Sequence, residues 1–156
     1  MSPRAACRLA TLGFTRVYDY APGKVDWLAR GLSGEGARAG EATAGSLARN
    51  DVATSSLEAS TGEVRRVIAD SLYGYALVLS PGGVVLGRVQ KSALDTLSDG
   101  DPIDTVLEPR PQTIRPHLTE AKLEERFEAY GLRTLVVTRP DGTLIGVVRR
   151  DDIATS

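Results

Sequence analysis

The amino-acid sequence predicts a mixed α/β fold, of the α+β type, in which one β-α-β-β-α unit occurs twice. Two phrases carry this prediction: GVVLGRVQ begins at Gly83, and GTLIGVVR begins at Gly142, 59 residues later. Each phrase opens with a glycine, continues with aliphatic residues and has a second glycine four positions on. Internal similarity at a fixed spacing is the sequence signature of a repeated structural unit. We therefore expect two similar halves behind a different N-terminal segment.

The composition narrows the classes of function. The chain has 156 residues, 42% hydrophobic and 25% charged, with a net charge of −1, as in an ordinary globular protein. A balanced charge offers no basic field for nucleic acid, and the apolar runs are too short to span a membrane. The N-terminus lacks the apolar core of a secretory signal, and the single Cys7 cannot form an internal disulfide. We therefore expect a cytoplasmic protein that binds neither nucleic acid nor membrane.

Residues 1–34 are expected to form a short helix-strand-helix segment. The three predicted elements are Arg4–Leu12, Arg16–Tyr20 and Lys24–Arg30. Gly13 follows the first helix, as is usual at a helix C-terminus. Residues 35–49 are rich in glycine and alanine and read as a linker, with a short helix at Ala42–Arg49.

Residues 50–99 and 105–156 are predicted to form the two halves, and each begins with an extended piece followed by a helix. The helices are expected at 60–72 and 119–130, because apolar residues recur there at helical spacing. These residues are Val64, Val67, Ile68 and Leu72 in the first helix, and Leu123, Phe127 and Tyr130 in the second. Ser60 and Glu63 predict a capping box, whereas Lys122 stands at the matching position of the second helix.

Two strands joined by a tight turn follow in each half. YALVLS (75–80) and VVLGRV (84–89) flank one turn, and TLVVT (134–138) and TLIGVV (143–148) flank the other. Proline and glycine in both turns supply the backbone angles that hairpins need. The strands are nearly unbroken aliphatic runs, which predicts that both of their faces are covered. A last helix is expected to begin near Gln90 and near Arg149.

This order of elements resembles the cystathionine-β-synthase (CBS) domain. The resemblance runs from Asn50 to Ser156 and rests on Gly87, Gly146, the turns before them, and LRTLVVTRPDGTLIGVVRRDDI (132–153). It implies a tandem pair of CBS repeats packed sheet to sheet about a pseudo-twofold axis. It also implies pairing of such modules into a disc-like homodimer.

The resemblance further implies a ligand signature, which is a glycine, then Ser or Thr three residues on, then Asp or Asn six residues on. The acidic residue accepts hydrogen bonds from the ribose hydroxyls of an adenosine. The first half departs at both polar positions, with Gln90 and Ala93, whereas the second keeps the acid as Asp152 and has Arg149 in place of the hydroxyl. The candidate nucleotide-binding set is Thr113, Ile114, Arg133, Thr134, Gly146, Arg149 and Asp152.

Two functions stay open at this point. The first is a non-catalytic regulatory module that senses an adenosine-containing effector, such as AMP, ATP or S-adenosylmethionine, between the repeats. The second is a structural or protein-interaction CBS dimer without a small-molecule ligand, since RRDD (149–152) is also an ordinary charge run at a helix start. His117, the only histidine, has no Cys or His partner for a metal site, and neither reading includes a catalytic residue.

The N-terminal segment resembles the C-terminal end of a rhodanese domain, mainly through GKVDWLARGL (23–32). In that family the nucleophilic cysteine stands in a loop before the matching residues. Cys7 lies inside a predicted helix, with no loop of amides to lower its pKa. The resemblance therefore implies a catalytically incomplete fragment, and we expect it to act as a docking piece with Phe14 and Trp27 as apolar anchors.

Overall fold

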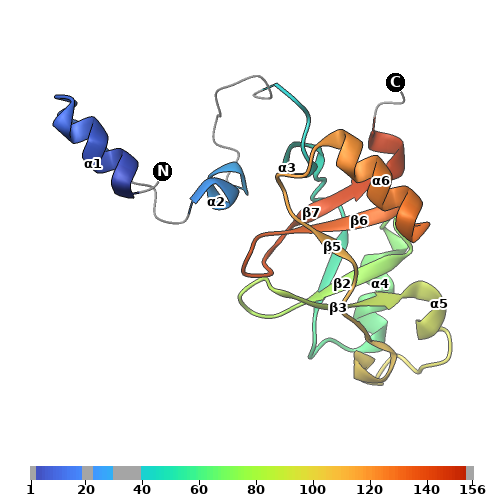
Figure 1. Ribbon diagram of the computed structural model, residues 1–156. Coiled ribbons are helices and arrows are strands. Elements are labelled where there is room, and N and C mark those ends of the chain that lie inside the picture. Colours follow the sequence, from blue (N-terminus) through green and yellow to red (C-terminus); the bar gives the residue numbers. More distant parts are fainter. Residues whose placement is uncertain (1–2, 19–22, 30–39, 154–156) are drawn as a thin grey trace.

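The protein folds into two small β-sheets that face each other, each with helices on its outer side (Figure 1). A computed structural model describes residues 3–18, 23–29 and 40–153. The first half contains β1 (Ala53–Ser56), α4 (Thr61–Ala69), β2 (Tyr75–Leu79), β3 (Val85–Gln90), α5 (Lys91–Leu94), the 3-10 helix η1 (Ile103–Val106) and β4 (Glu108–Pro109). The second contains β5 (Thr113–Ile114), α6 (Glu120–Tyr130), β6 (Thr134–Thr138), β7 (Leu144–Arg149) and the 3-10 helix η2 (Arg150–Asp152).

The two sheets share one topology. β1 pairs in parallel with β2, and β2 pairs antiparallel with β3. β5, β6 and β7 repeat these pairings in the same order. The register of the hairpin breaks between Val78 and Leu79 in one sheet and between Val137 and Thr138 in the other. Both breaks therefore fall at positions that the sequence offset of 59 residues superimposes.

The helix predicted at 119–130 is α6 (Glu120–Tyr130), whereas the helix of the first half has its predicted cap but is shorter than predicted. The Ser60–Glu63 capping box forms, with the Ser60 amide donating to Glu63 Oε2 over 2.8 Å. However, α4 ends at Ala69 and not at residue 72. Val67 lies within α4 but is 40% exposed, and Leu72 lies beyond the end of the helix and is 80% exposed. Both were wrongly predicted to lie on the apolar face.

The core has one cluster within each half and a third between the halves. Side chains alternate along β2, so that Ala76 and Val78 pack beneath α4 while Tyr75 and Leu77 face the other sheet. The strands of the second half alternate likewise, and Val136 and Val147 join Tyr75, Leu77 and Val52 in the central cluster. Burial on both faces accounts for the unbroken aliphatic runs in the sequence.

The two hairpin turns, which made the repeat visible in the sequence, lie side by side (Figure 1). The Leu144 amide donates to the Gly83 carbonyl over 2.9 Å, and the Val85 amide donates to the Gly142 carbonyl over 3.1 Å. Both glycines have a positive φ, 77° at Gly83 and 88° at Gly142, which an L-residue with a side chain rarely adopts.

Each sheet is extended by the chain that leads into the other half. β4 precedes the second half but pairs with β3 of the first, whereas Arg49 precedes the first half but forms an antiparallel bridge with Val147 on β7. A Cβ on Gly87 would lie 2.7 Å from the Glu108 carbonyl oxygen, and one on Gly146 would lie 2.5 Å from that of Arg49. The second glycine of each phrase therefore makes room for this crossing backbone.

The N-terminal helices are α1 (Pro3–Thr11), α2 (Gly23–Ala29) and α3 (Ala44–Leu47). α1 and α2 lie apart from the sheets (Figure 1), and Phe14 is 61% exposed. The strand predicted from Arg16 was wrong for Arg16–Tyr18, which have no neighbouring strand to pair with, and its last two residues lie outside the described part. No helix within the described residues has the length and apolar character needed to cross a membrane.

α3 packs with the second half, although it lies in the segment predicted as a linker. Thr43 and Ser46 form a capping box at its start. Ala44 is fully buried in the core cluster that contains Leu123 and Phe127. The predicted final helix near Arg149 is the short 3-10 helix η2, and neither η1 nor β4 was predicted.

Candidate functional site

The structure distributes the seven candidate residues along the second sheet. Thr134 opposes Arg149 in the β6–β7 ladder, and the Arg150 amide donates to the Arg133 carbonyl over 2.9 Å. Arg133, Thr134, Arg149 and Asp152 therefore share one end of the sheet. Thr113 and Ile114 lie on β5 at one edge, and the Asp152 side chain points to Arg49 beyond β7 at the other. β5 and β7 lie on either side of β6, with neighbouring strands about 4.8 Å apart.

Ile114 and Gly146 have roles in packing. The Ile114 side chain is 5% exposed and belongs to the core of the second half, so only its backbone is available to a ligand. Gly146 receives the backbone of Arg49. Arg149 Nη2 lies 3.0 Å from Asp151 Oδ2, and the Asp151 side chain is 81% exposed.

The Asp152 carboxylate is partly enclosed and only partly satisfied. Its side chain is 23% exposed, and Oδ1 lies 3.5 Å from Arg49 Nη1. Oδ2 is buried and has no hydrogen-bond partner. A buried acceptor without a partner costs about 1–3 kcal/mol, and more when it is charged. This oxygen is therefore suited to receive a donor from outside the chain.

Arg49 connects Asp152 to residues of the first half. Its guanidinium donates to Asp51 Oδ2 from Nη2 over 3.0 Å and from Nε over 3.2 Å, and Tyr73 Oη donates to Asp51 Oδ1. The hydrogen bond from Tyr73 makes the largest contribution to lowering the pKa of Asp51 below its ordinary value, and the hydrogen bonds from Arg49 lower it further. Burial, followed by the hydrogen bond to Asp51, raises the pKa of Tyr73 to about 12. The four side chains thus form a continuous polar chain across the two halves.

Sequence reasoning missed Arg49, Asp51 and Tyr73. All three lie just before strands of the first half, where no periodic pattern or turn signal marks them. The offset of 59 residues offered one clue, because it superimposes Arg49 on Glu108. Each of these two residues lies where its segment crosses to the other sheet.

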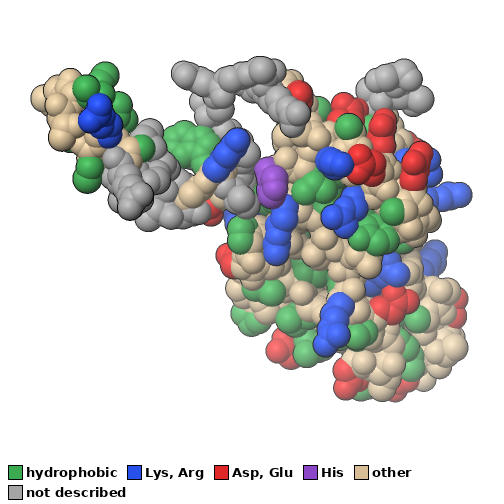
Figure 2. Space-filling model, in the orientation of Figure 1, with side chains coloured by type: hydrophobic (Ala, Val, Ile, Leu, Met, Phe, Trp, Pro, Cys, Tyr) green, Lys and Arg blue, Asp and Glu red, His purple; other side chains and the backbone are tan. Residues whose placement is uncertain are grey.

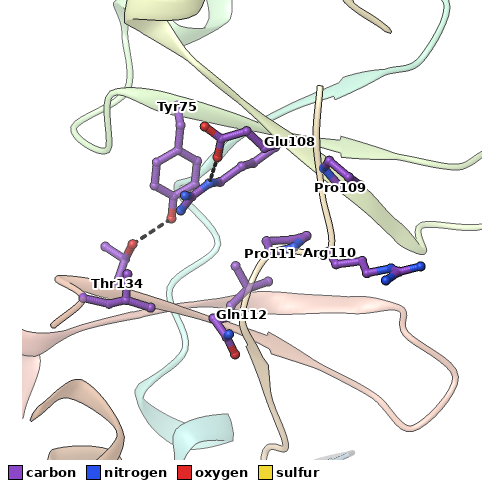
Figure 3. Close-up of a pocket in the computed structure, with 10 residues that line it drawn as sticks. Tyr75, Glu108, Pro109, Arg110, Pro111, Gln112 and Thr134 are labelled. Carbon is purple, nitrogen blue, oxygen red and sulfur yellow. Dashed lines mark hydrogen bonds and ion pairs between the residues drawn. The ribbon is translucent and has the colours of Figure 1, made fainter. Parts of the chain in front are cut away.

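A separate cavity of about 120 Å³ lies between the halves, on the side of Gln112 and Thr134 (Figure 3). Tyr75 Oη donates to Thr134 Oγ1 over 3.1 Å, and Arg88 Nε donates to Glu108 Oε2 over 2.6 Å. The remaining lining residues are Pro109, Arg110, Pro111, Gln112, Leu132 and Val136. Ligand pockets usually measure roughly 300–1,000 Å³, so this cavity is too small to enclose a nucleotide without opening.

Among residues 3–18, 23–29 and 40–153, the other reactive groups form no second centre. Cys7 is exposed on α1, and His117 has a buried Nδ1 without a partner. The described residues contain no group of three His, Cys, Asp or Glu side chains that could hold a metal ion. On the face shown in Figure 2, acidic and basic side chains are interspersed over both halves.

Comparison with known proteins finds similarity to one family. Residues 96–156 match the model of the CBS domain family, and no curated protein sequence matches the chain. Among solved structures, the CBS domains of a transcriptional regulator from Streptococcus pneumoniae match with a TM-score of 0.63 and 21% identity, over 71% of this chain and 95% of that one. CBSX2 in complex with AMP matches with a TM-score of 0.62 and 18% identity, over 71% and 92%.

A third solved structure, the cytosolic domain of the Mg²⁺ channel MgtE in complex with ATP, has a TM-score of 0.63 and 20% identity. The match covers 71% of this chain but only 47% of that domain, so this chain corresponds to about half of it. At these identities the likeness shows the fold, which is the α+β fold of CBS-domain structures.

Proposed function

We propose that this chain is a non-catalytic regulatory module built on a tandem pair of CBS repeats, and that it senses an adenosine-containing nucleotide at Asp152. The observation that carries the proposal is the buried, unpartnered Oδ2 of Asp152, at the position where the family signature has its ribose-binding acid. A carboxylate oxygen can accept from a ribose hydroxyl, and hydrogen bonds to charged groups contribute about 1.5–3 kcal/mol each.

The surroundings of Asp152 support a nucleotide as the ligand. Arg149 and Arg133 lie at the same end of the sheet, and Arg149 pairs with the exposed Asp151. Two of the matching solved structures contain ATP or AMP. Arginine suits phosphate because its guanidinium presents a planar fork of donors. Adenosine would thus be held through ribose at Asp152, with its phosphates toward the arginines.

Such a ligand would act by shifting the packing of the two halves. Asp152 belongs to the second half, whereas Asp51 and Tyr73, which reach it through Arg49, belong to the first. A molecule that contacts both sides favours one relative arrangement over another, and the shift is limited by its difference in affinity for the two. In a homodimer, which the family resemblance implies, the same shift would alter the contact between subunits.

A second candidate function is a protein-interaction scaffold without a small-molecule ligand. It is favoured by Arg49, which already lies near the Asp152 carboxylate, and by the cavity of about 120 Å³ between the halves. In this case AMP, ATP and S-adenosylmethionine at millimolar concentration would leave the melting temperature unchanged, whereas a binding site would raise it.

The proposal assigns a docking role to the rhodanese-like N-terminal fragment and no sulfur transfer. Cys7 is exposed on α1. A thiosulfate-to-cyanide assay should therefore show no activity above buffer. A rate that disappears in Cys7→Ser would contradict this part of the proposal.

The decisive experiment measures nucleotide affinity by calorimetry in the parent chain and in Asp152→Ala. Loss of one or two charged hydrogen bonds should weaken binding by roughly tenfold to a hundredfold. Asp95→Ala provides the matched control, because Asp95 is an exposed acid at the corresponding end of the first half. Equal affinity in the parent chain and in Asp152→Ala would place the ligand elsewhere.

A further inference from the structure

The Asp152 carboxylate faces a cation from its own chain. Arg49 Nη1 lies 3.5 Å from Asp152 Oδ1. We infer that Arg49 is a built-in competitor for Asp152, which a ligand must displace from Oδ1 before both oxygens of this carboxylate can accept hydrogen bonds from it. This inference rests on the proposed function of the Asp152 site and concerns how that site is regulated.

The position of Arg49 is set by its backbone. The Arg49 amide donates to the Val147 carbonyl over 2.9 Å, and the Val147 amide donates to the Arg49 carbonyl over 2.9 Å. Gly146 leaves the space that this close approach requires. The guanidinium therefore starts from a fixed point at the edge of β7, beside η2, and its reach to Asp152 is a property of the folded sheet.

The contacts of Arg49 are unequal, which makes displacement easy. Two donors reach Asp51 over 3.0 and 3.2 Å, whereas one reaches Asp152 over 3.5 Å. A separation of 3.5 Å is at the outer limit of a hydrogen bond. Asp51 is also held in place by Tyr73. Arg49 can therefore leave Asp152 and keep its ion pair with Asp51, so that the charge of Arg49 itself stays paired.

The same contact ties ligand binding to the upstream segment. Arg49 lies two residues after α3, which packs with the second half through Ala44. When a ribose hydroxyl replaces the guanidinium at Asp152, Arg49 keeps its ion pair with Asp51 and its backbone stays on β7. Ligand affinity is then reduced by the fraction of molecules in which Arg49 occupies the carboxylate.

The test compares nucleotide affinity in the parent chain and in Arg49→Gln, with AMP, ATP and S-adenosylmethionine as the probes. Arg49 is 44% exposed at its side chain, and exposed ion pairs are weak, so removing the competitor should tighten binding by about twofold to fivefold. Arg126→Gln is the matched control, because it removes the same charge from α6, where Arg126 bonds Tyr130. Equal or weaker binding by Arg49→Gln would overturn the inference.

A second measurement examines the contact without any ligand. Unfolding free energies of Arg49→Gln, Asp152→Asn and the double variant form a cycle, in which the two changes should be non-additive if the side chains interact. Additive effects would overturn the inference. A non-additive cycle with no nucleotide binding by either the parent chain or Arg49→Gln would refute the proposed function, and the competitor role with it. Binding by Arg49→Gln alone would support both.

Discussion

The hydrogen bond between Tyr73 and Asp51 links the protonation of two residues on opposite sides of neutral pH. Tyr73 keeps its proton because it is partly buried and donates to a carboxylate, so its pKa rises from 10.0 to about 12. Asp51 loses its proton more readily than usual, because it accepts this hydrogen bond and those from Arg49. The pair therefore stabilises the fold while Tyr73 is neutral and Asp51 is ionised.

The first prediction concerns alkaline unfolding. A phenol whose pKa is raised in the folded state contributes stability that is complete below its unfolded pKa and is lost as pH rises through the folded value. The free energy of unfolding should therefore fall between about pH 10 and pH 12. Tyr73→Phe should flatten this part of the curve, as measured by denaturant unfolding at each pH. Tyr18→Phe, at a side chain that is 73% exposed, should keep the parent slope.

An identical slope in Tyr73→Phe and the parent chain would show that Tyr73 does not carry the alkaline loss. The acid side has the opposite sign. The contribution of Asp51 is present above its ordinary pKa of 3.8 and is lost as pH falls through its lowered value.

At the residue scale, local chemistry was predictable and distant partners were not. The capping box of Ser60 and Glu63 follows from a four-residue pattern, and the structure contains it. Arg49 could not be assigned to Asp152, because the two are 103 residues apart and nothing near either one encodes the contact. Such a pairing depends on which strand edge the chain crosses, which is a property of the tertiary fold.

The elements of each half depend on two glycines that the sequence repeats. Gly87 and Gly146 lie in the middle of β3 and β7, where glycine usually weakens a strand. They are tolerated because backbone from the other half passes directly over them. A side chain at either position would overlap a backbone carbonyl group, that of Glu108 at Gly87 and that of Arg49 at Gly146.

The second prediction is that Gly146→Ala and Gly87→Ala each destabilise the protein by about 1–3 kcal/mol, as overpacking does in a closed core. The new Cβ would lie 2.5 Å from the Arg49 carbonyl oxygen or 2.7 Å from that of Glu108. Gly100→Ala is the control, since nothing lies within 4 Å of its Cβ position. Denaturant midpoints would measure the differences. If Gly146→Ala had the same denaturant midpoint as Gly100→Ala, the backbone of Arg49 would not pack tightly against Gly146.

At the element scale, hydrophobic period and turn chemistry predicted the helix and the hairpin of each half. The misses share a physical cause. η1 and β4 consist of short, polar or proline-containing stretches with no period of their own. β4 exists because β3 offers an unpaired edge to the passing chain. Leu72 was assigned to a helix on spacing alone, although the chain leaves that helix at Asp70.

At the scale of the whole molecule, the halves interlock, which means that backbone hydrogen bonds as well as side-chain packing join them. Each sheet is extended by the segment that leads into the other half, the hairpin turns bond to each other, and a shared cluster fills the space between the sheets. The offset of 59 residues predicted two similar halves. It could not predict the interlocking, because the superposition of Arg49 on Glu108 does not say which sheet either crossing segment joins.

The interlocking leads to the last prediction, which compares two shortened chains. A chain of residues 40–156 keeps α3 and Arg49, whereas a chain of residues 51–156 keeps every strand and loses both. The second chain lacks Ala44 from the core of the second half, the two hydrogen bonds between Arg49 and Val147, and the partner of Asp152. Its melting temperature should therefore fall well below that of the first.

Amide hydrogen exchange would locate the loss. In the 51–156 chain, protection should decrease first at β7 and in the helix α6, which shares its core with α3, and less in β1 and β2, which belong to the other sheet. The chain of residues 40–156 keeps these contacts of α3 and Arg49, so protection at β7 and α6 should match that of the parent. Equal melting temperatures for the two shortened chains would mean that the second sheet does not depend on the segment before the first, and that the halves are stable without this crossing.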